Sequence, residues 1–118
     1  TIGICPGWGG TQRLLRIIGP ARAKDLIFTG RKIGTEEALS MGLINKIFPA
    51  ESLISESKIY AKNITKNSSF AVGKSKMLVN KGIDANLDTG LKLEIYSWSL
   101  CFSSKDREER MRAFVEKK

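Results

Sequence analysis

The residues best suited to chemistry lie in a glycine-rich stretch near the start of the chain, Pro-Gly-Trp-Gly-Gly-Thr-Gln-Arg-Leu at positions 6–14. Gly7, Gly9 and Gly10 can adopt positive φ angles or let a ligand approach the backbone closely. The N–H groups that open a helix have no partner inside it, so a loop that leads into a helix can hold an oxygen, an anion or a polarised water. The stretch therefore predicts a backbone binding corner.

Other kinds of catalytic site are excluded by composition. The chain has no histidine, which excludes Ser-His-Asp and Cys-His catalysis and imidazole zinc sites within it. Cys5 and Cys101 are far apart and form no CxxC motif, so we expect two buried, reduced thiols. Glu36 and Glu37 are adjacent, but neighbours on a helix point about 100° apart. They are expected to complement the helix dipole rather than to form an acid–base pair.

The formal net charge of +8 is spread over the 118 residues with acidic residues interspersed. A solvated surface is the simplest explanation, and attraction of a polyanion such as coenzyme A or RNA is the functional alternative. No apolar run is long enough to span a bilayer. Because Thr1 is not a methionine and opens directly into an apolar run, we expect a piece of a longer protein.

The elements that position the glycine-rich stretch are a strand at 2–5 before it and a helix after it. Pro20 favours the start of the next helix, which Gly30 ends. Thr35 is expected to cap a third helix that Gly42 ends. Residues 43–48 are expected to form a short strand.

The remainder of the chain is expected to be helical. Helices are expected at about 50–66, at 69–82 with Ser69 as its cap, and from 87 onward. Ser103 and Ser104 should end the third of these helices and cap a last one. The third helix carries an apolar stripe wider than a pair of helices can cover, so self-association is expected; the stripe comprises Leu87, Leu91, Ile95, Trp98 and Phe102. The last helix is expected to bury a face of Met111, Phe114 and Val115. The fold class is mostly α.

The stretch 6–14 also resembles the loop-and-helix segment of the enoyl-CoA hydratase (crotonase) family. Further matches follow in order at 26–31, 37–45 and 111–117. The resemblance covers essentially all 118 residues and only the C-terminal half of such a protein. It implies the C-terminal part of a crotonase-like (ClpP/crotonase) α/β spiral fold, with 1–49 as the end of the core and 50–118 as a helical trimerisation region.

The activity implied by the resemblance is reversible addition of water to the double bond of a short-chain enoyl-CoA, as in fatty-acid β-oxidation or butyrate metabolism. Enzymes of this family, also called 3-hydroxyacyl-CoA dehydratases, hold the thioester oxygen with two N–H groups and use two glutamates. By family register these residues fall before Thr1. We therefore expect no catalytic side chain and no activity in this chain alone. Coenzyme A is part of the substrate, and no other cofactor or metal is expected.

Four positions carry over from the family to substrate binding. The Gly7 N–H matches a group that helps to hold the attacking water. Trp8 would wall the acyl pocket and favour short chains, unless it packs on the following helix. Trp98 matches an aromatic near the adenine of coenzyme A on a neighbouring subunit, unless it is a core residue. Lys117 matches a lysine that reaches the coenzyme A phosphates.

Alternative functions remain open at this point. The chain could belong to an enoyl-CoA isomerase or a related acyl-CoA enzyme, or act as a helical oligomerisation module without chemistry; a basic nucleic-acid binder is the least favoured alternative. The expected partners are an acyl-CoA and further copies of the chain, as a trimer or dimer of trimers, with neither nucleic acid nor membrane. The expected location is the cytoplasm, or the mitochondrial matrix in a eukaryote.

Overall fold

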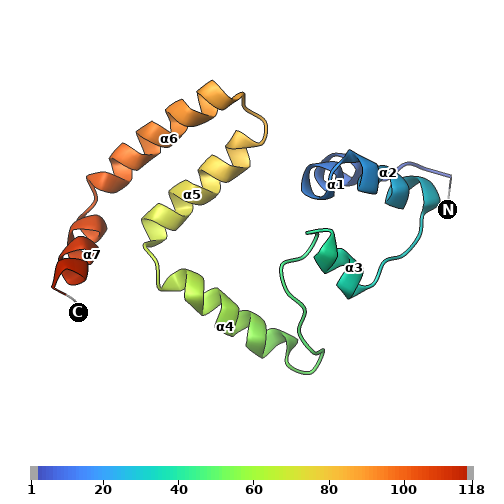
Figure 1. The fold of residues 1–118 in the computed structure, drawn as a ribbon, viewed down its shortest axis with the longest axis horizontal. Coiled ribbons are helices and arrows are strands. Elements are labelled where there is room, and N and C mark those ends of the chain that lie inside the picture. The colour runs from blue at the N-terminus through green and yellow to red at the C-terminus, as the bar shows by residue number, and fades with distance from the viewer. Residues whose placement is uncertain (1–2, 117–118) are drawn as a thin grey trace. The chain divides into compact units, whose positions relative to one another are not determined.

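The structure, a computed structural model, describes residues 3–116. Within that range the regular elements are all α-helices (Figure 1). They are α1 (Gly10–Ile18), α2 (Pro20–Thr29), α3 (Thr35–Ser40), α4 (Leu53–Thr65), α5 (Ser69–Gly82), α6 (Leu87–Phe102) and α7 (Lys105–Val115). The mostly helical fold class predicted from the sequence is confirmed.

Side-chain caps fix where the later helices begin. Ser68 accepts a hydrogen bond from the N–H of Ala71 at the start of α5. In the same way Asn86 accepts from the N–H of Thr89 in α6, and Ser104 accepts from the N–H of Arg107 in α7. A capping oxygen satisfies one of the otherwise unpaired first-turn donors, so each cap sets a helix boundary. The expected cap by Ser104 is confirmed, whereas the cap of α5 is Ser68 rather than Ser69.

Glycines mark the boundaries of the early helices. Gly30, with φ 63°, follows the last residue of α2, as predicted. Thr35 was expected to cap the third helix, but it is the first residue inside α3 and the capping position is Gly34. The α3 start therefore has no side-chain cap, and Glu36 and Glu37 lie in its first turn.

The chain divides into two compact units, Thr1–Leu53 and Ile54–Lys118. In the first unit α1 packs against α2, and the buried apolar residues are Ile18, Ala23 and Ala38. Whether 1–49 and 50–118 have the separate roles expected from the sequence stays a prediction.

Both predicted strands are wrong for the residues that the structure describes. Residues 3–5 and 43–48 contain no β-structure. A strand is stable only when its N–H and C=O groups pair with a neighbouring strand, and residues 3–116 contain no strand to pair with. The N–H groups of Leu43 and Ile44 instead donate to the Ala38 carbonyl, at 2.9 and 3.4 Å. The segment after α3 thus closes off the end of that helix.

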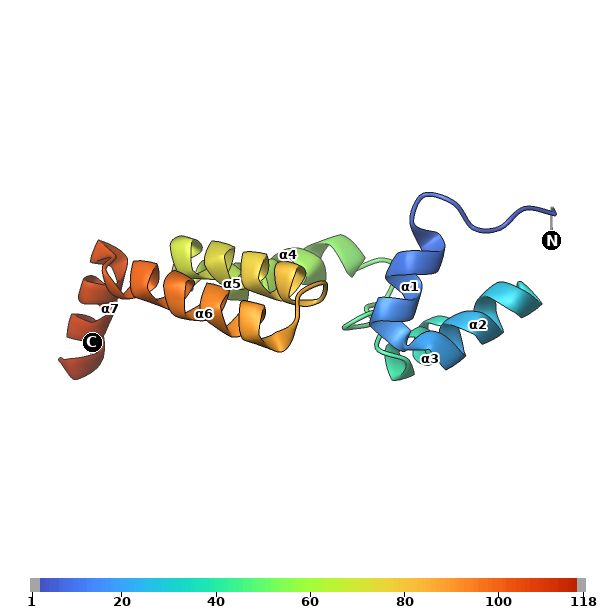
Figure 2. The same cartoon turned by 90° about the horizontal axis from the view of Figure 1, so that it is seen from above.

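In the second unit α5 and α6 lie side by side as a helical hairpin (Figure 2). Ser97 is the buried residue of this pair, with only 1% of its surface exposed. The apolar stripe of α6, defined above, is exposed along its length. The face of Met111, Phe114 and Val115 on α7 was expected to be buried, and this prediction is wrong because all three side chains are exposed. One helix can cover only a narrow strip of its neighbour, so most apolar side chains remain outside it.

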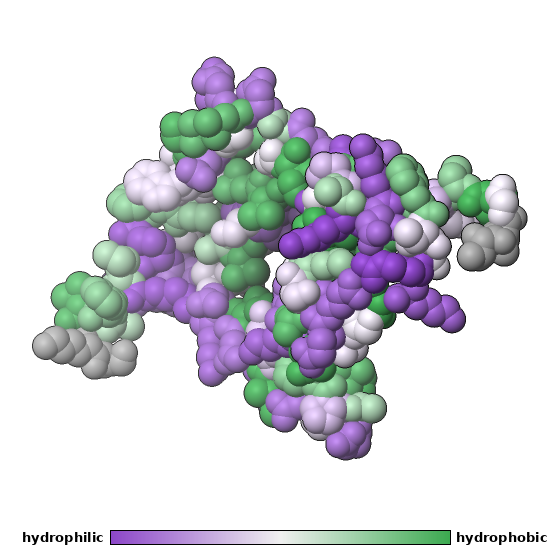
Figure 3. Space-filling view, turned by 45° about the vertical axis from the view of Figure 1, so that its right-hand side comes forward, coloured by the Kyte–Doolittle hydropathy of each residue, from purple (hydrophilic) through white to green (hydrophobic). Residues whose placement is uncertain are grey.

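Much of the visible surface is accordingly apolar, shown in green in Figure 3. Cys5 is exposed and Cys101 is half-buried, and both thiols are free, so the expectation of two buried thiols is wrong for Cys5. In residues 3–116 each helix is too short or too polar to cross a bilayer. The same residues contain no cluster of three or more side chains able to hold a metal ion.

Candidate functional site

The glycine-rich stretch forms a tight turn that feeds directly into α1. The N–H of Gly10 donates to the Gly7 carbonyl at 2.9 Å. The two central residues, Trp8 and Gly9, have φ angles of 54° and 79°, as in a type I′ turn. The N–H groups of Gln12 and Arg13 donate to the Gly9 carbonyl at 3.1 and 2.9 Å. The predicted loop at a helix N-terminus is therefore present.

The turn exposes Gly7 and Trp8, the two of its residues that the family resemblance assigns to substrate binding. Gly7 is exposed, and Trp8 has 98% of its surface exposed. Packing of Trp8 on the following helix, the alternative left open by the sequence, is therefore wrong. A bulky residue at positive φ is strained unless its surroundings fix it. The indole is held away from α1 by backbone geometry, and its role toward an acyl chain stays a prediction.

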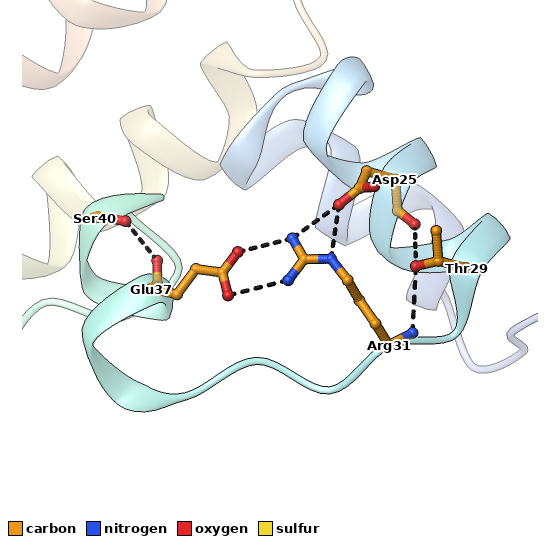
Figure 4. A network of polar contacts seen from close by, with 5 residues as sticks. All are labelled: Asp25, Thr29, Arg31, Glu37 and Ser40. Atoms are coloured by element: carbon orange, nitrogen blue, oxygen red, sulfur yellow. Dashed lines mark hydrogen bonds and ion pairs between the residues drawn. The ribbon is translucent and has the colours of Figure 1, made fainter.

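A second polar cluster in the first unit joins the end of α2 to α3 through Arg31 (Figure 4). The Arg31 Nε donates to Asp25 Oδ2 at 2.9 Å, and Nη1 and Nη2 donate to the two carboxylate oxygens of Glu37 at 3.0 and 2.7 Å. Thr29 Oγ1 accepts from the Arg31 N–H at 3.3 Å. We call Asp25, Arg31 and Glu37 the Arg31 clamp.

Charge pairing in the Arg31 clamp shifts the pKa values of two of its members. The hydrogen bond to Glu37, followed by that to Asp25, raises the pKa of Arg31 further above its usual range. The hydrogen bond from Arg31 lowers the pKa of Glu37 below its usual value. Glu37 thus pairs with Arg31, and its complementation of the helix dipole together with Glu36 stays a prediction. The clamp could not be predicted from the sequence because its three members lie on three different segments. The one signal in the sequence was that Asp25 and Glu37 each lie six residues from Arg31.

The second unit contains a groove of about 390 Å³ beside Trp98. Trp98 stacks on Phe102 with ring centroids 4.9 Å apart and planes at 26°. The guanidinium of Arg107 lies 4.3 Å from the centre of the Phe102 ring. With 61% of its surface exposed, Trp98 is not the core residue that the sequence left as an alternative. A flat ring and a guanidinium make this groove suited to planar or anionic groups.

Polar contacts of Arg110 and Asp106 fix the position of α7 beside this groove. Arg110 Nη1 donates to the Lys66 carbonyl at 2.9 Å, and its Nε donates to Asp106 at 3.0 Å. Asp106 also accepts a hydrogen bond from Ser68, and this bond is the largest cause of the lowered pKa of Asp106, followed by the bond from Arg110. The contacts of α7 with Lys66 and Ser68, which are distant from it in sequence, determine where α7 lies in the second unit.

The predicted binding residues are distributed over both units. Gly7 and Trp8 belong to the first unit and Trp98 to the second. Lys117 lies outside the residues that the structure describes. The geometry supplies binding surfaces, while the described residues bring together no pair of carboxylates suited to acid–base catalysis.

Comparisons with known proteins agree on one family. The profile of the enoyl-CoA hydratase/isomerase family matches residues 1–118. Short-chain-enoyl-CoA hydratase from Clostridium acetobutylicum is 43% identical over 117 residues, which are 99% of this chain and 45% of that protein. The enzyme of the same name from Clostridioides difficile is 45% identical over 97% of this chain and 74% of its own length.

Solved structures give the same result. The crystal structure of an enoyl-CoA hydratase from Bacillus anthracis superposes with a TM-score of 0.95 at 41% identity, covering 99% of this chain and 45% of that one. By sequence alone, the mitochondrial enoyl-CoA hydratase of Pongo abelii is 40% identical over 99% of this chain and 40% of its own length. Apart from the Clostridioides difficile protein, this chain thus spans less than half of each of these relatives.

Proposed function

The chain belongs to the enoyl-CoA hydratase/isomerase family, and on that premise we propose that it is part of a short-chain enoyl-CoA hydratase. The reaction is the reversible addition of water to the double bond of an enoyl-CoA thioester. The observation that supports this choice is the identity of about 40% to proteins named short-chain-enoyl-CoA or crotonyl-CoA hydratases, over nearly the whole chain. The fatty-acid or butyrate context proposed from the sequence fits such substrates.

In this proposal the turn before α1 serves the reacting end of the substrate. The N–H of Gly7 donates a hydrogen bond to the attacking water, and an exposed backbone N–H held in a fixed turn is suited to that task. Trp8 lines the space for the acyl chain, where its indole leaves room for short substrates only. The exposed indole and the positive φ of Trp8 support this role.

The second unit serves the coenzyme A end of a substrate held mainly by an adjacent copy. Trp98 offers a half-exposed ring for the adenine, and Lys117 offers a cation for the phosphates. The stack with Phe102 holds the Trp98 ring in place. In this proposal the protein is a homo-oligomer, a trimer or a dimer of trimers, and the exposed apolar stripe of α6 supports such association.

The 118 residues by themselves are proposed to be inactive because they contain neither of the two family glutamates. The test compares the isolated chain with the full-length protein that contains it, using crotonyl-CoA and the loss of its conjugated thioester absorbance. Turnover by the full-length protein and none by the chain would support the proposal. Turnover by the isolated chain at a comparable rate would contradict it.

The alternatives give different results in the same assay. An enoyl-CoA isomerase would move the double bond of a 3-enoyl-CoA and raise the conjugated absorbance instead. An oligomerisation module without chemistry would leave both substrates unchanged in every form of the protein. No observation on the described residues favours either alternative over the hydratase.

A further inference from the structure

We propose that Arg13 is a positioning residue that locks the turn before α1 and thereby fixes the N–H of Gly7. This inference rests on the role proposed above for Gly7. Arg13 touches neither the water nor the substrate in this scheme. It acts through the backbone of Trp8 and Gly9.

The turn needs such a lock because one of its central residues is not glycine. Trp8 has a φ of 54° and is the non-glycine residue with positive φ in residues 3–116. A left-handed conformation is unfavourable for a large side chain and persists only where the surroundings impose it. With 98% of its surface exposed, the indole itself gains little from packing. The constraint must therefore come from the backbone contacts.

Arg13 supplies that constraint. Its Nη2 donates to the Trp8 carbonyl at 2.6 Å, a short bond strengthened by the positive charge of the donor. This bond fixes the orientation of the peptide between Trp8 and Gly9. Because Arg13 also donates its own N–H to the Gly9 carbonyl at 2.9 Å, both carbonyls of the turn centre are held by one residue.

The guanidinium also occupies the space beside Gly9. A Cβ atom built on Gly9 would lie 3.2 Å from Arg13 Nη1 and 3.3 Å from Cζ, a tight contact that a side chain would disturb. On the other side, a Cβ on Gly10 would lie 3.2 Å from Cβ of Pro6. Arg13 and Pro6 therefore enclose the turn, and the two glycines allow this close approach.

Loss of the Arg13 side chain frees the Trp8–Gly9 peptide to rotate out of the left-handed arrangement. Gly7 is the first residue of the same turn and accepts the hydrogen bond from Gly10. Once Trp8 leaves positive φ, the type of the turn changes, which loosens that bond and moves the Gly7 N–H. A shift on the order of 1 Å in a group that positions a reactant can lower a rate up to about 100-fold.

The experiment replaces Arg13 with methionine in the full-length protein. Arg16→Met is the matched control, since it removes the same charge from the same helix, and Arg16 donates to the carbonyl and the side-chain oxygen of Gln12. Amide hydrogen exchange at Gly10 reports the turn directly. Hydration of crotonyl-CoA reports its effect on the reaction.

We expect Arg13→Met to speed Gly10 exchange about tenfold and to lower kcat about tenfold with KM changed less than about twofold. Arg16→Met should alter none of these quantities by more than about twofold. Equal effects of the two variants, or unchanged Gly10 exchange in Arg13→Met, would overturn the inference.

A rescue variant separates positioning from general loss of structure. Glycine adopts positive φ without strain, so Trp8→Gly in the Arg13→Met background should restore Gly10 protection at least partly. Because Trp8 also belongs to the proposed acyl site, the rescue is read by Gly10 exchange alone, and failure of Trp8→Gly to restore that protection would contradict the inference. If the full-length wild-type protein has no hydratase activity, the proposed function fails, and Gly10 exchange still decides whether Arg13 locks the turn.

Discussion

Replacing Ser97 with alanine should stabilise the second unit. Ser97 lies on α6 with 1% of its surface exposed, in a hollow that it shares with Ala71, Lys74 and Ser75 of α5. Within the described residues its Oγ has no hydrogen-bond partner. A buried hydroxyl without a partner costs about 1–3 kcal/mol because it loses its bonds to water on folding.

The expected gain follows from three contributions. Removing the hydroxyl recovers about 1–3 kcal/mol, and the higher helix propensity of alanine adds up to about 0.5 kcal/mol. The void left by one oxygen atom subtracts about a few tenths of a kcal/mol. Ser97→Ala should therefore raise the free energy of unfolding by about 1–3 kcal/mol.

Ser99→Ala is the matched control on the same helix. Ser99 is exposed and its Oγ already donates to the Ile95 carbonyl at 3.0 Å, so its replacement gains the helix propensity alone. Urea unfolding of the 118-residue chain can be followed by Trp98 fluorescence in a Trp8→Phe background, which confines the signal to the second unit. A lower midpoint for Ser97→Ala than for Ser99→Ala, at equal slope, would refute the reasoning because it would show that the Ser97 hydroxyl is bonded.

Three further outcomes are expected. The lowered pKa of Glu37 means that its stabilising contribution is present above its ordinary pKa of 4.5 and is lost as the pH falls; thermal unfolding between pH 7 and 3 should show this loss in the wild type and in Glu36→Gln but not in Glu37→Gln. In the full-length protein, Trp8→Ala should raise kcat/KM for an enoyl-CoA longer than crotonyl-CoA about tenfold relative to crotonyl-CoA, by admitting further methylenes; an unchanged ratio would exclude Trp8 from the acyl site. Lys117→Ala should raise KM with kcat little changed, by about 1 kcal/mol in apparent binding because exposed charges are screened; a tenfold loss of kcat at constant KM would contradict the coenzyme A role.

The family and the helical fold class could be predicted from the sequence because they depend on local patterns. The glycine-rich stretch at 6–14 encodes its own turn, and Ser104 caps α7 through residues three positions away. The strand at 43–48 was predicted wrongly because its stability depends on a pairing partner that a local apolar pattern cannot supply. Burial of the face of Met111, Phe114 and Val115 on α7 was also predicted wrongly, since periodicity identifies an apolar face without specifying what covers it.

In the candidate site, too, features set by a local motif could be predicted, and contacts between separate segments could not. Gly7 and Trp8 were identified by motif, and the structure adds the positive φ of Trp8 and the contact from Arg13. The position of Arg13 four residues after Gly9 is visible in the sequence, but nothing in its residue type shows that it turns back toward the loop. The Arg31 clamp required knowledge of three segments at once, which periodicity does not provide.

The Arg31 clamp also provides a chemical probe of motion in the first unit. Dicarbonyl reagents attack the neutral form of a guanidine, and the hydrogen bonds to Glu37 and Asp25 both occupy the N–H groups of Arg31 and raise its pKa. Arg31 should therefore be modified more slowly than exposed arginines such as Arg22. Its modification rate becomes a reporter of how often α2 and α3 separate, since only the open form presents an unpaired side chain to the reagent.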